Sequence, residues 1–239
     1  MTINLLDALP ALAKALDGEA LELARRHAVV PAVDLEPGSW APSAHAETRP
    51  GDLGLLVVDG FMTRDVHLGP TVACEVVGRG DVLRPSEHDG DEAPVPFAVE
   101  WRVLSPARIA ILDRRAALVL GRWPELIEAL IQTGIKRSHS LALHLAVCHL
   151  RGVETRLRVM FWHLADRWGS VTPEGVHIPM RLTHELIGRL VGAQRPSVTT
   201  ALGGLTSRGE LSRRPDGTWM LHGDPPDLLG ELRDAAERS

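Results

Sequence analysis

Small side chains recur at helical spacing between residues 195 and 207 and leave one face of that segment without bulk. They are Pro196, Thr200, Gly203 and Ser207. A helix with such a face can come close to another surface, and the major groove of DNA is wide enough to admit a helix. The chemistry that this spacing indicates is contact with a nucleic-acid duplex.

Two short amphipathic helices are expected to position that face. The first begins at Thr183, whose hydroxyl can cap free amides, and ends at Gly192. The second begins near Arg195, with Pro196 tolerated in its first turn. Apolar residues at helical spacing predict the buried faces: Leu186, Ile187, Leu190 and Val191 in the first helix, and Val198, Leu202 and Leu205 in the second. The pattern predicts a helix-turn-helix, with an ordinary helical hairpin in a core as the alternative.

Residues 211–221, LSRRPDGTWML, follow these helices and have the pattern of a β-hairpin. Pro215-Asp216-Gly217 supplies its turn. Helices followed by a hairpin predict a winged helix. Arg213 and Arg214 stand where such a wing would meet phosphate, and two solvated arginines on a turn are the alternative.

Composition indicates an ordinary globular protein of about two domains. The 239 residues are 44% hydrophobic and 24% charged, and two cysteines are too few for a disulfide framework. Neither an apolar run of about 18 residues nor a basic leader is present, so we expect no membrane span and a cytoplasmic location. Residues 1–121 hold 11 Lys and Arg against 18 Asp and Glu, whereas residues 151–222 hold 10 Arg against 6 acids. The basic segment contains the predicted DNA-contacting helices.

Short apolar stretches alternate with turn signals from Gly54 to Leu112 and predict a β-sandwich or jelly roll. The turns are expected at Asp59-Gly60, at residues 78–81 and at Asp89-Gly90. Within residues 97–104 one face is expected to be buried, with Phe97, Val99, Trp101 and Val103, and the other exposed, with Ala98, Glu100 and Arg102. Residues 2–27 are predicted to be helical.

A long helix is predicted from about Trp123 to Leu150. Residues spaced alternately four and three positions apart form a seam along one side of this helix. They are Ile127, Ile131, Gly134, Ser138, Leu141, Leu145 and Cys148. This heptad pattern predicts a parallel dimer helix, and burial against the chain's own β-domain is the alternative. A further helix is predicted from Arg156 to Trp168, with an apolar face formed by Leu157, Phe161, Leu164, Ala165 and Trp168.

This order of parts resembles the Crp/Fnr superfamily of bacterial transcription regulators. The resemblance is specific in the C-terminal third, in VETRLRVMFWHLADRWG, IPMRLTHELIGRLVGA and RPSVTTALGGLTSRGEL, and architectural in the N-terminal half. It implies an α+β fold with a jelly-roll, cyclic-nucleotide-binding-like domain at 1–121, a dimerisation helix at 122–152 and a winged helix-turn-helix at 153–239.

The resemblance also implies a cytoplasmic homodimer that regulates transcription by binding palindromic double-stranded DNA, with RNA polymerase as a candidate partner and no enzymatic activity. Arg195 matches the arginine that reads a base, where its guanidinium could span O6 and N7 of guanine. Thr183, Gln194 and Ser197 match phosphate-contacting positions. Pro196 and Thr200 replace a glutamate and an arginine of the family, which puts the familiar operators in doubt. Thr199 and Thr200 offer hydroxyls or a methyl to a base.

The effector site departs from the family. The Arg-Ser or Arg-Thr pair that holds a cyclic phosphate falls at Phe97 and Ala98, and the hydroxyl pair of the dimer helix corresponds to Leu141 and Ala142. The loop that precedes Phe97 contains the carboxylates of Glu87, Asp89, Asp91 and Glu92, which would repel phosphate. We therefore expect no response to cyclic AMP through this cassette, and no cofactor or metal.

Other interpretations of the sequence are less well supported by its motifs. His67 with Cys74 could suggest haem, and the acidic loop with His88 a divalent cation. The β-domain carboxylates could serve a metal-assisted hydrolase, but the chain lacks a nucleophile elbow, a phosphate loop, HExxH and CxxC. The same fold could also act through a protein partner or an unidentified ligand without tight DNA recognition. Gly203-Gly204 in the second helix favours that interpretation.

Overall fold

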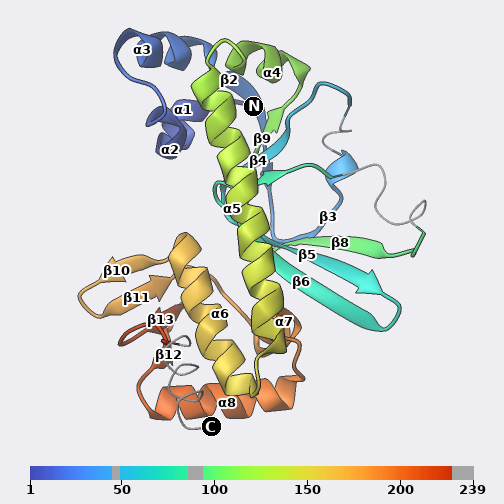
Figure 1. Ribbon diagram of the computed structural model, residues 1–239, viewed down its shortest axis with the longest axis vertical. Coiled ribbons are helices and arrows are strands. Elements are labelled where there is room, and N and C mark those ends of the chain that lie inside the picture. Colours follow the sequence, from blue (N-terminus) through green and yellow to red (C-terminus); the bar gives the residue numbers. More distant parts are fainter. Residues whose placement is uncertain (45–48, 86–93, 228–239) are drawn as a thin grey trace, which may run out of the picture. The chain divides into compact units, whose positions relative to one another are not determined.

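The computed structural model describes residues 1–44, 49–85 and 94–227 of an α+β chain (Figure 1). The chain divides into two compact units, Met1–Leu143 and His144–Ser239. Helix α5, Pro124–His149, crosses the border between them. No helix in the described ranges is long and apolar enough to cross a membrane.

Two antiparallel sheets form the body of the first unit and confirm the predicted jelly-roll domain. One has the order β1-β2-β9-β4-β7, with β1 Thr2–Asn4, β2 Val29–Leu35, β9 Ala107–Leu112, β4 Gly54–Asp59 and β7 Val82–Leu83. The other has the order β3-β8-β5-β6, with β3 Gly38–Trp40, β8 Ala98–Val103, β5 Phe61–Leu68 and β6 Thr71–Gly78. The sequence did not predict β1, β2 or β3.

A hydrophobic core fills the space between the two sheets. Trp40 and Trp101 meet there edge to face, with ring centroids 5.8 Å apart. Trp101 and Val103 are buried, whereas Ala98, Glu100 and Arg102 are exposed, which confirms the alternation predicted for β8. The predicted turn at Asp59-Gly60 is present, and Gly60 has φ +84°. A Cβ at Gly60 would lie 2.4 Å from the Pro106 carbonyl oxygen, so the turn requires glycine. Asp89-Gly90 lies outside the described residues.

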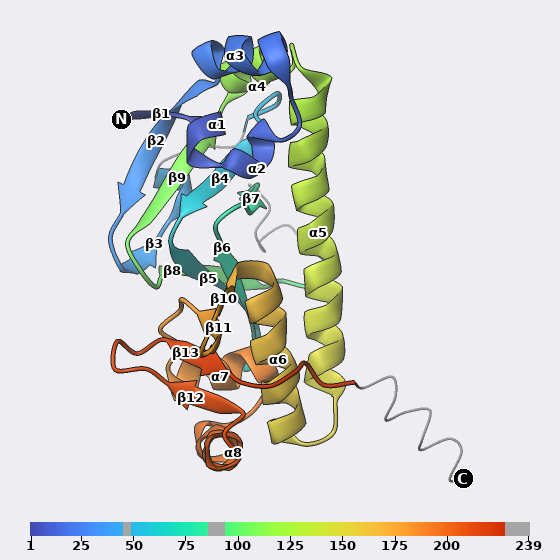
Figure 2. The ribbon, with the colours of Figure 1, turned by 90° about the vertical axis from the view of Figure 1, so that its left-hand side faces the viewer.

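Short helices cover the other face of the five-stranded sheet (Figure 2). They are α1 Leu5–Ala8, α2 Pro10–Ala13, α3 Gly18–His27 and α4 Arg114–Leu120. Strand β4 is therefore buried on both faces, because Leu55 and Val57 face the inter-sheet core while Leu56 and Val58 pack with the helices. The prediction of helix over residues 2–27 was wrong at Thr2–Asn4, which pairs with β2 as a strand.

Helix α5 is buried along one side of its first turns and mostly exposed beyond them. Leu126 and Leu130 pack in the helical core of the first unit, with Ile127 beside them. Ile131, Leu141 and Leu145 are exposed by 57%, 40% and 63%. The alternative of burial against the chain's own domain thus describes the first turns of α5 and not its middle.

The second unit has the winged-helix order of elements. It contains α6 Val153–Trp168, β10 Ser170–Thr172, β11 Gly175–Ile178, α7 His184–Val191, α8 Arg195–Ser207, β12 Leu211–Arg213 and β13 Trp219–Leu221. The strands form one antiparallel sheet in the order β10-β11-β13-β12. Helix α6 begins three residues before the predicted Arg156, and Trp168 is half-buried rather than buried. The β10–β11 hairpin was not predicted.

Candidate DNA-binding interface

Helix α7 has the limits and the buried face that the sequence predicts. The Leu186 amide donates to Thr183 Oγ1 at 3.2 Å, which caps the helix. Gly192 ends the helix in the left-handed conformation, with φ +60°. Leu186, Ile187, Leu190 and Val191 are all buried.

A glycine inside α7 allows the tight turn to α8. The Ala193 amide donates to the Gly188 carbonyl at 2.9 Å. A Cβ at Gly188 would lie 2.5 Å from the Ala193 oxygen, so a larger residue would push the turn away. Sequence reasoning missed Gly188, although a glycine in the middle of an amphipathic helix is a usable signal of close packing.

Helix α8 is amphipathic in the predicted sense. Val198, Leu202 and Leu205 are buried, together with Ala201. The opposite face is exposed and consists of Pro196, Thr200, Gly203 and Ser207. Element contacts place α8 against both α6 and α7. The apolar face of α8 therefore packs against α6 and α7, while its face of small side chains is exposed to solvent.

Unused donors gather at the N-terminus of α8. Gln194 is the N-cap residue, and its side chain makes no cap hydrogen bond within the described residues. Arg195 and Ser197 are exposed, and the Arg195 guanidinium has no hydrogen bond or ion pair in the described part of the chain. Because helix N-termini attract anions, these side chains are placed to meet a phosphate or a base edge.

The two threonines on α8 have their hydroxyls bonded within the protein. Thr199 Oγ1 donates to the Arg195 carbonyl at 3.0 Å and lies 2.9 Å from His184 Nδ1. Thr200 Oγ1 donates to the Pro196 carbonyl at 3.2 Å. The hydroxyl hydrogens of both residues are thus committed to the helix backbone.

Gly204 has a packing reason, whereas Gly203 has none. A Cβ at Gly204 would lie 2.7 Å from Glu154 Oε2 on α6, and nothing described lies within 4 Å of a Cβ at Gly203. Arg208, after the end of α8, donates to Glu154 and to Glu210 at 2.6 Å each. These contacts hold the C-terminal end of α8 against α6.

A second arginine clasp, which the sequence analysis missed, supports the turn. Arg156 Nη1 donates to the Val191 carbonyl at 2.9 Å and to the Gly192 carbonyl at 3.1 Å, at the end of α7. Its Nε donates to the Leu150 carbonyl at 3.0 Å. A basic group at a helix C-terminus satisfies carbonyls that have no helical partner.

The hairpin turn between β12 and β13 carries the two predicted wing arginines in different environments. Arg213 is exposed, with its guanidinium 5.8 Å from the Trp219 ring centroid. Arg214 lies 3.8 Å from a Glu174 carboxylate oxygen and 4.0 Å from one of Asp216. Hydrogen bonds from the Thr218 hydroxyl and amide lower the pKa of Asp216, so it stays ionised. Arg213 is therefore the more available of the two for phosphate.

The residues assigned to the effector cassette lie on separate elements. Phe97 is half-buried, and Ala98 is exposed at the start of β8. Leu141 and Ala142 are exposed on α5. None of the four provides a hydrogen-bonding side chain. The acidic residues Glu87, Asp89, Asp91 and Glu92, and His88, lie outside the described residues.

A buried carboxylate, not anticipated from the sequence, joins α5 to the β-roll. Glu75 on β6 is 7% exposed. Arg137 on α5 donates to its Oε1 at 2.6 Å, and an Arg64 nitrogen lies 3.5 Å from the same oxygen. Arg64 also lies 5.8 Å from the Trp101 ring centroid. The sequence feature that could have predicted these ion pairs is the single acid, Glu75, in the apolar strand TVACEVVG, because buried charges are almost always paired.

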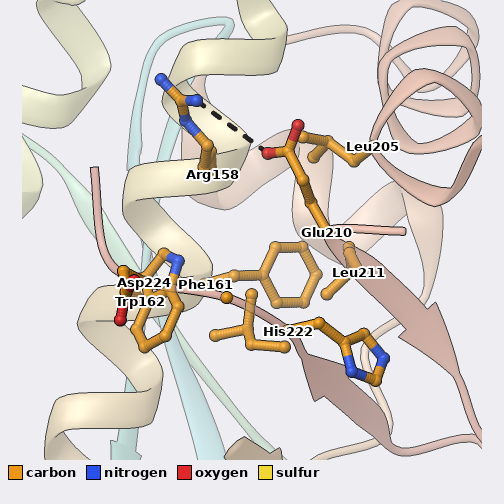
Figure 3. A pocket seen from close by; sticks show the side chains of 10 residues that line it. Arg158, Phe161, Trp162, Leu205, Glu210, Leu211, His222 and Asp224 are labelled. Atoms are coloured by element: carbon orange, nitrogen blue, oxygen red, sulfur yellow. Dashed lines mark ion pairs between the residues drawn. The ribbon is translucent and has the colours of Figure 1, made fainter. Parts of the chain in front are cut away.

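A pocket of about 200 Å³ lies in the second unit (Figure 3). Its floor is apolar, with Phe161, Leu205 and Leu211, and at its rim Arg158 and Glu210 form an ion pair of 3.9 Å. Small-molecule sites are usually about 300–1,000 Å³. The pocket is therefore small for a nucleotide.

Comparisons with known proteins agree with this architecture. No family model matches the sequence. The CRP-like cAMP-activated global transcriptional regulator of Mycobacterium tuberculosis is 27% identical over 195 residues, covering 79% of this chain and 83% of that protein. A cyclic nucleotide-binding domain containing protein from Listeria monocytogenes has a TM-score of 0.64 at 14% identity, covering 88% of this chain and 95% of that chain. A CooA mutant from Carboxydothermus hydrogenoformans has a TM-score of 0.59 at 15% identity, covering 86% and 87%.

The fold and the order of elements match those of the solved structures, and the sequence is similar to that of a CRP-like transcriptional regulator. The resemblance inferred from the sequence is confirmed. At their low identity the solved structures establish the shared fold alone, and the similarity to the regulator from Mycobacterium tuberculosis supports the resemblance to the Crp/Fnr superfamily.

The Glu75 cluster gives a stability prediction. Glu75→Gln keeps the shape of the side chain but removes the negative charge that pairs with Arg137, and we expect it to lower the free energy of unfolding by about 2 kcal/mol. This is less than for a fully buried pair, because the arginine side chains remain 19% and 27% exposed. Chemical denaturation measures the change. Glu100→Gln, on an exposed carboxylate, is the control and should have little effect. Equal stability of wild type and Glu75→Gln would contradict the role given to this carboxylate.

Proposed function

We propose that the chain is a cytoplasmic, homodimeric transcription regulator that binds a palindromic operator by inserting α8 into the major groove. One observation carries the proposal: α8 buries one face against α6 and α7 and exposes a face of small side chains, with Arg195 as the one charged residue of the helix. RNA polymerase is a candidate partner. The relatives are regulators, and we propose no enzymatic role.

The middle of α5 supports the homodimer. Ile131, Leu141 and Leu145 are exposed apolar side chains on this helix. With Gly134 and Ser138 they follow the steps of three and four that a parallel helix pair buries. A dimer through α5 would supply two copies of α8, as a palindrome requires.

A charge in this seam should separate the protomers. We expect Leu145→Glu to convert the dimer to monomer, because two carboxylates would face each other in an apolar interface. Lys136→Glu, at the opposite side of α5 by helical periodicity, should leave the dimer intact. Sedimentation equilibrium measures both variants. A Leu145→Glu protein that remains dimeric would place the interface elsewhere.

Two arginines should affect DNA binding differently. We expect Arg195→Ala to lose about 1–3 kcal/mol of discrimination at one base pair of each half-site. Arg213→Ala should weaken binding to all duplexes alike and reduce the salt dependence by about one phosphate contact. Titration of selected and scrambled duplexes at several salt concentrations distinguishes the two effects. Unchanged selectivity of Arg195→Ala would remove it as a base reader.

The proposed regulator does not use cyclic AMP through the usual phosphate cassette. The curated relative is named a cAMP-activated regulator. In this chain Phe97 and Ala98 stand at the phosphate positions, and Leu141 and Ala142 at the base-contacting positions.

Isothermal titration calorimetry tests this part of the proposal. Cyclic AMP and cyclic GMP should give no heat of binding with the purified full-length chain, because neither an arginine nor a hydroxyl is available at the four positions. Micromolar affinity for either nucleotide would contradict the assignment.

A second candidate function keeps the fold but acts through a protein partner without tight DNA recognition. Gly203 favours it, because an exposed glycine inside a helix costs about 1 kcal/mol relative to alanine and has no packing reason here. Selection of bound fragments from random duplexes separates the two, since only the first candidate enriches a palindrome.

A further inference from the structure

Thr200 has a methyl group to offer a base edge but no free hydroxyl hydrogen. Its single hydroxyl hydrogen is donated to the Pro196 carbonyl at 3.2 Å. Thr200 is exposed on the open face of α8. What remains for contact outside the helix is an oxygen lone pair and the Cγ2 methyl group.

The neighbours of Thr200 allow the close approach that a short methyl needs. Pro196 lies one turn before it and Gly203 nearly one turn after it, and both are exposed. A Cβ at Gly203 would meet nothing described within 4 Å. Side chains this short let the helix backbone come near the floor of a groove. In the major groove the exposed apolar group is the C5-methyl of thymine.

Thr199 differs from Thr200 although it is adjacent. Its hydroxyl donates to the Arg195 carbonyl and also lies 2.9 Å from His184 Nδ1, at the first residue of α7. The Thr199 hydroxyl therefore has both of its hydrogen-bond partners, the Arg195 carbonyl and His184 Nδ1, inside the protein. Thr199 is therefore a positioning residue that ties the start of α7 to α8.

We propose that the Thr200 methyl reads a thymine in each operator half-site by contact with its C5-methyl, next to the base contacted by Arg195. This rests on the proposed function, because it assumes that α8 enters the major groove. Specificity would then come from one long cationic donor and one short apolar contact on the same helix.

The experiment uses the full-length dimer and an operator selected from random duplexes. Each thymine is replaced in turn by deoxyuridine, which lacks only the C5-methyl, at both symmetric positions. At one position we expect wild-type affinity to fall by about fourfold per half-site, the effect of losing one buried methyl contact. Thr200→Ser keeps the hydroxyl and should lose this sensitivity. Thr200→Val keeps a methyl and loses the hydroxyl, and should retain it.

Three outcomes overturn the inference, and they are distinguishable. If deoxyuridine is neutral at every position while Arg195→Ala still loses discrimination at one base pair of each half-site, the proposed regulator stands and the thymine contact does not. If Thr200→Ser loses affinity for the deoxyuridine operator as the wild type does, a residue other than Thr200 contacts the thymine methyl. If no sequence is enriched at all, the proposed function fails, and this inference fails with it.

Discussion

The close packing of α8 onto α7 and α6 is the constraint on which the winged-helix unit depends. It requires glycine at Gly188, because a Cβ there would lie 2.5 Å from the Ala193 backbone oxygen, whereas a Cβ at Gly204 would lie 2.7 Å from the movable end of the Glu154 side chain. Arg156 and Arg208 then fasten the two ends of this assembly through backbone carbonyls and carboxylates. With its inner face fixed, α8 can present an outer face that is both small and rigid.

The sensor-like unit is organised around a different interaction. Glu75, buried in β6, binds Arg137 of α5 and lies beside Arg64, so an internal carboxylate joins the roll to the long helix. Leu141 and Ala142, further along α5, are exposed and apolar. The ion pair thus holds the middle of α5 against the β-roll.

Periodicity predicted the elements well where each element buries one face. Val198, Leu202 and Leu205 are buried on α8 as expected, and Trp101 and Val103 on β8. Strand β2 was missed because Pro31 interrupts its pattern; Pro31 pairs with Thr2 of β1 and precedes Ala32, where the pairing of β2 with β9 begins. The contacts of Arg156 and Arg208 could not be predicted, because their partners are distant in sequence. Arg156 is 35 positions from Val191, and Arg208 is 54 positions from Glu154. Helical spacing placed Pro196, Thr200, Gly203 and Ser207 on one face, but the direction of the Thr200 hydroxyl required coordinates.

The central claim is that two copies of α8 occupy successive major grooves of one duplex. Hydroxyl-radical footprinting on a selected operator, combined with the mass of the complex, tests it most directly. The account predicts two chains per duplex and two protected regions whose centres lie about 34 Å apart along the helix axis. One chain per duplex, or equal protection along every sequence, would contradict it.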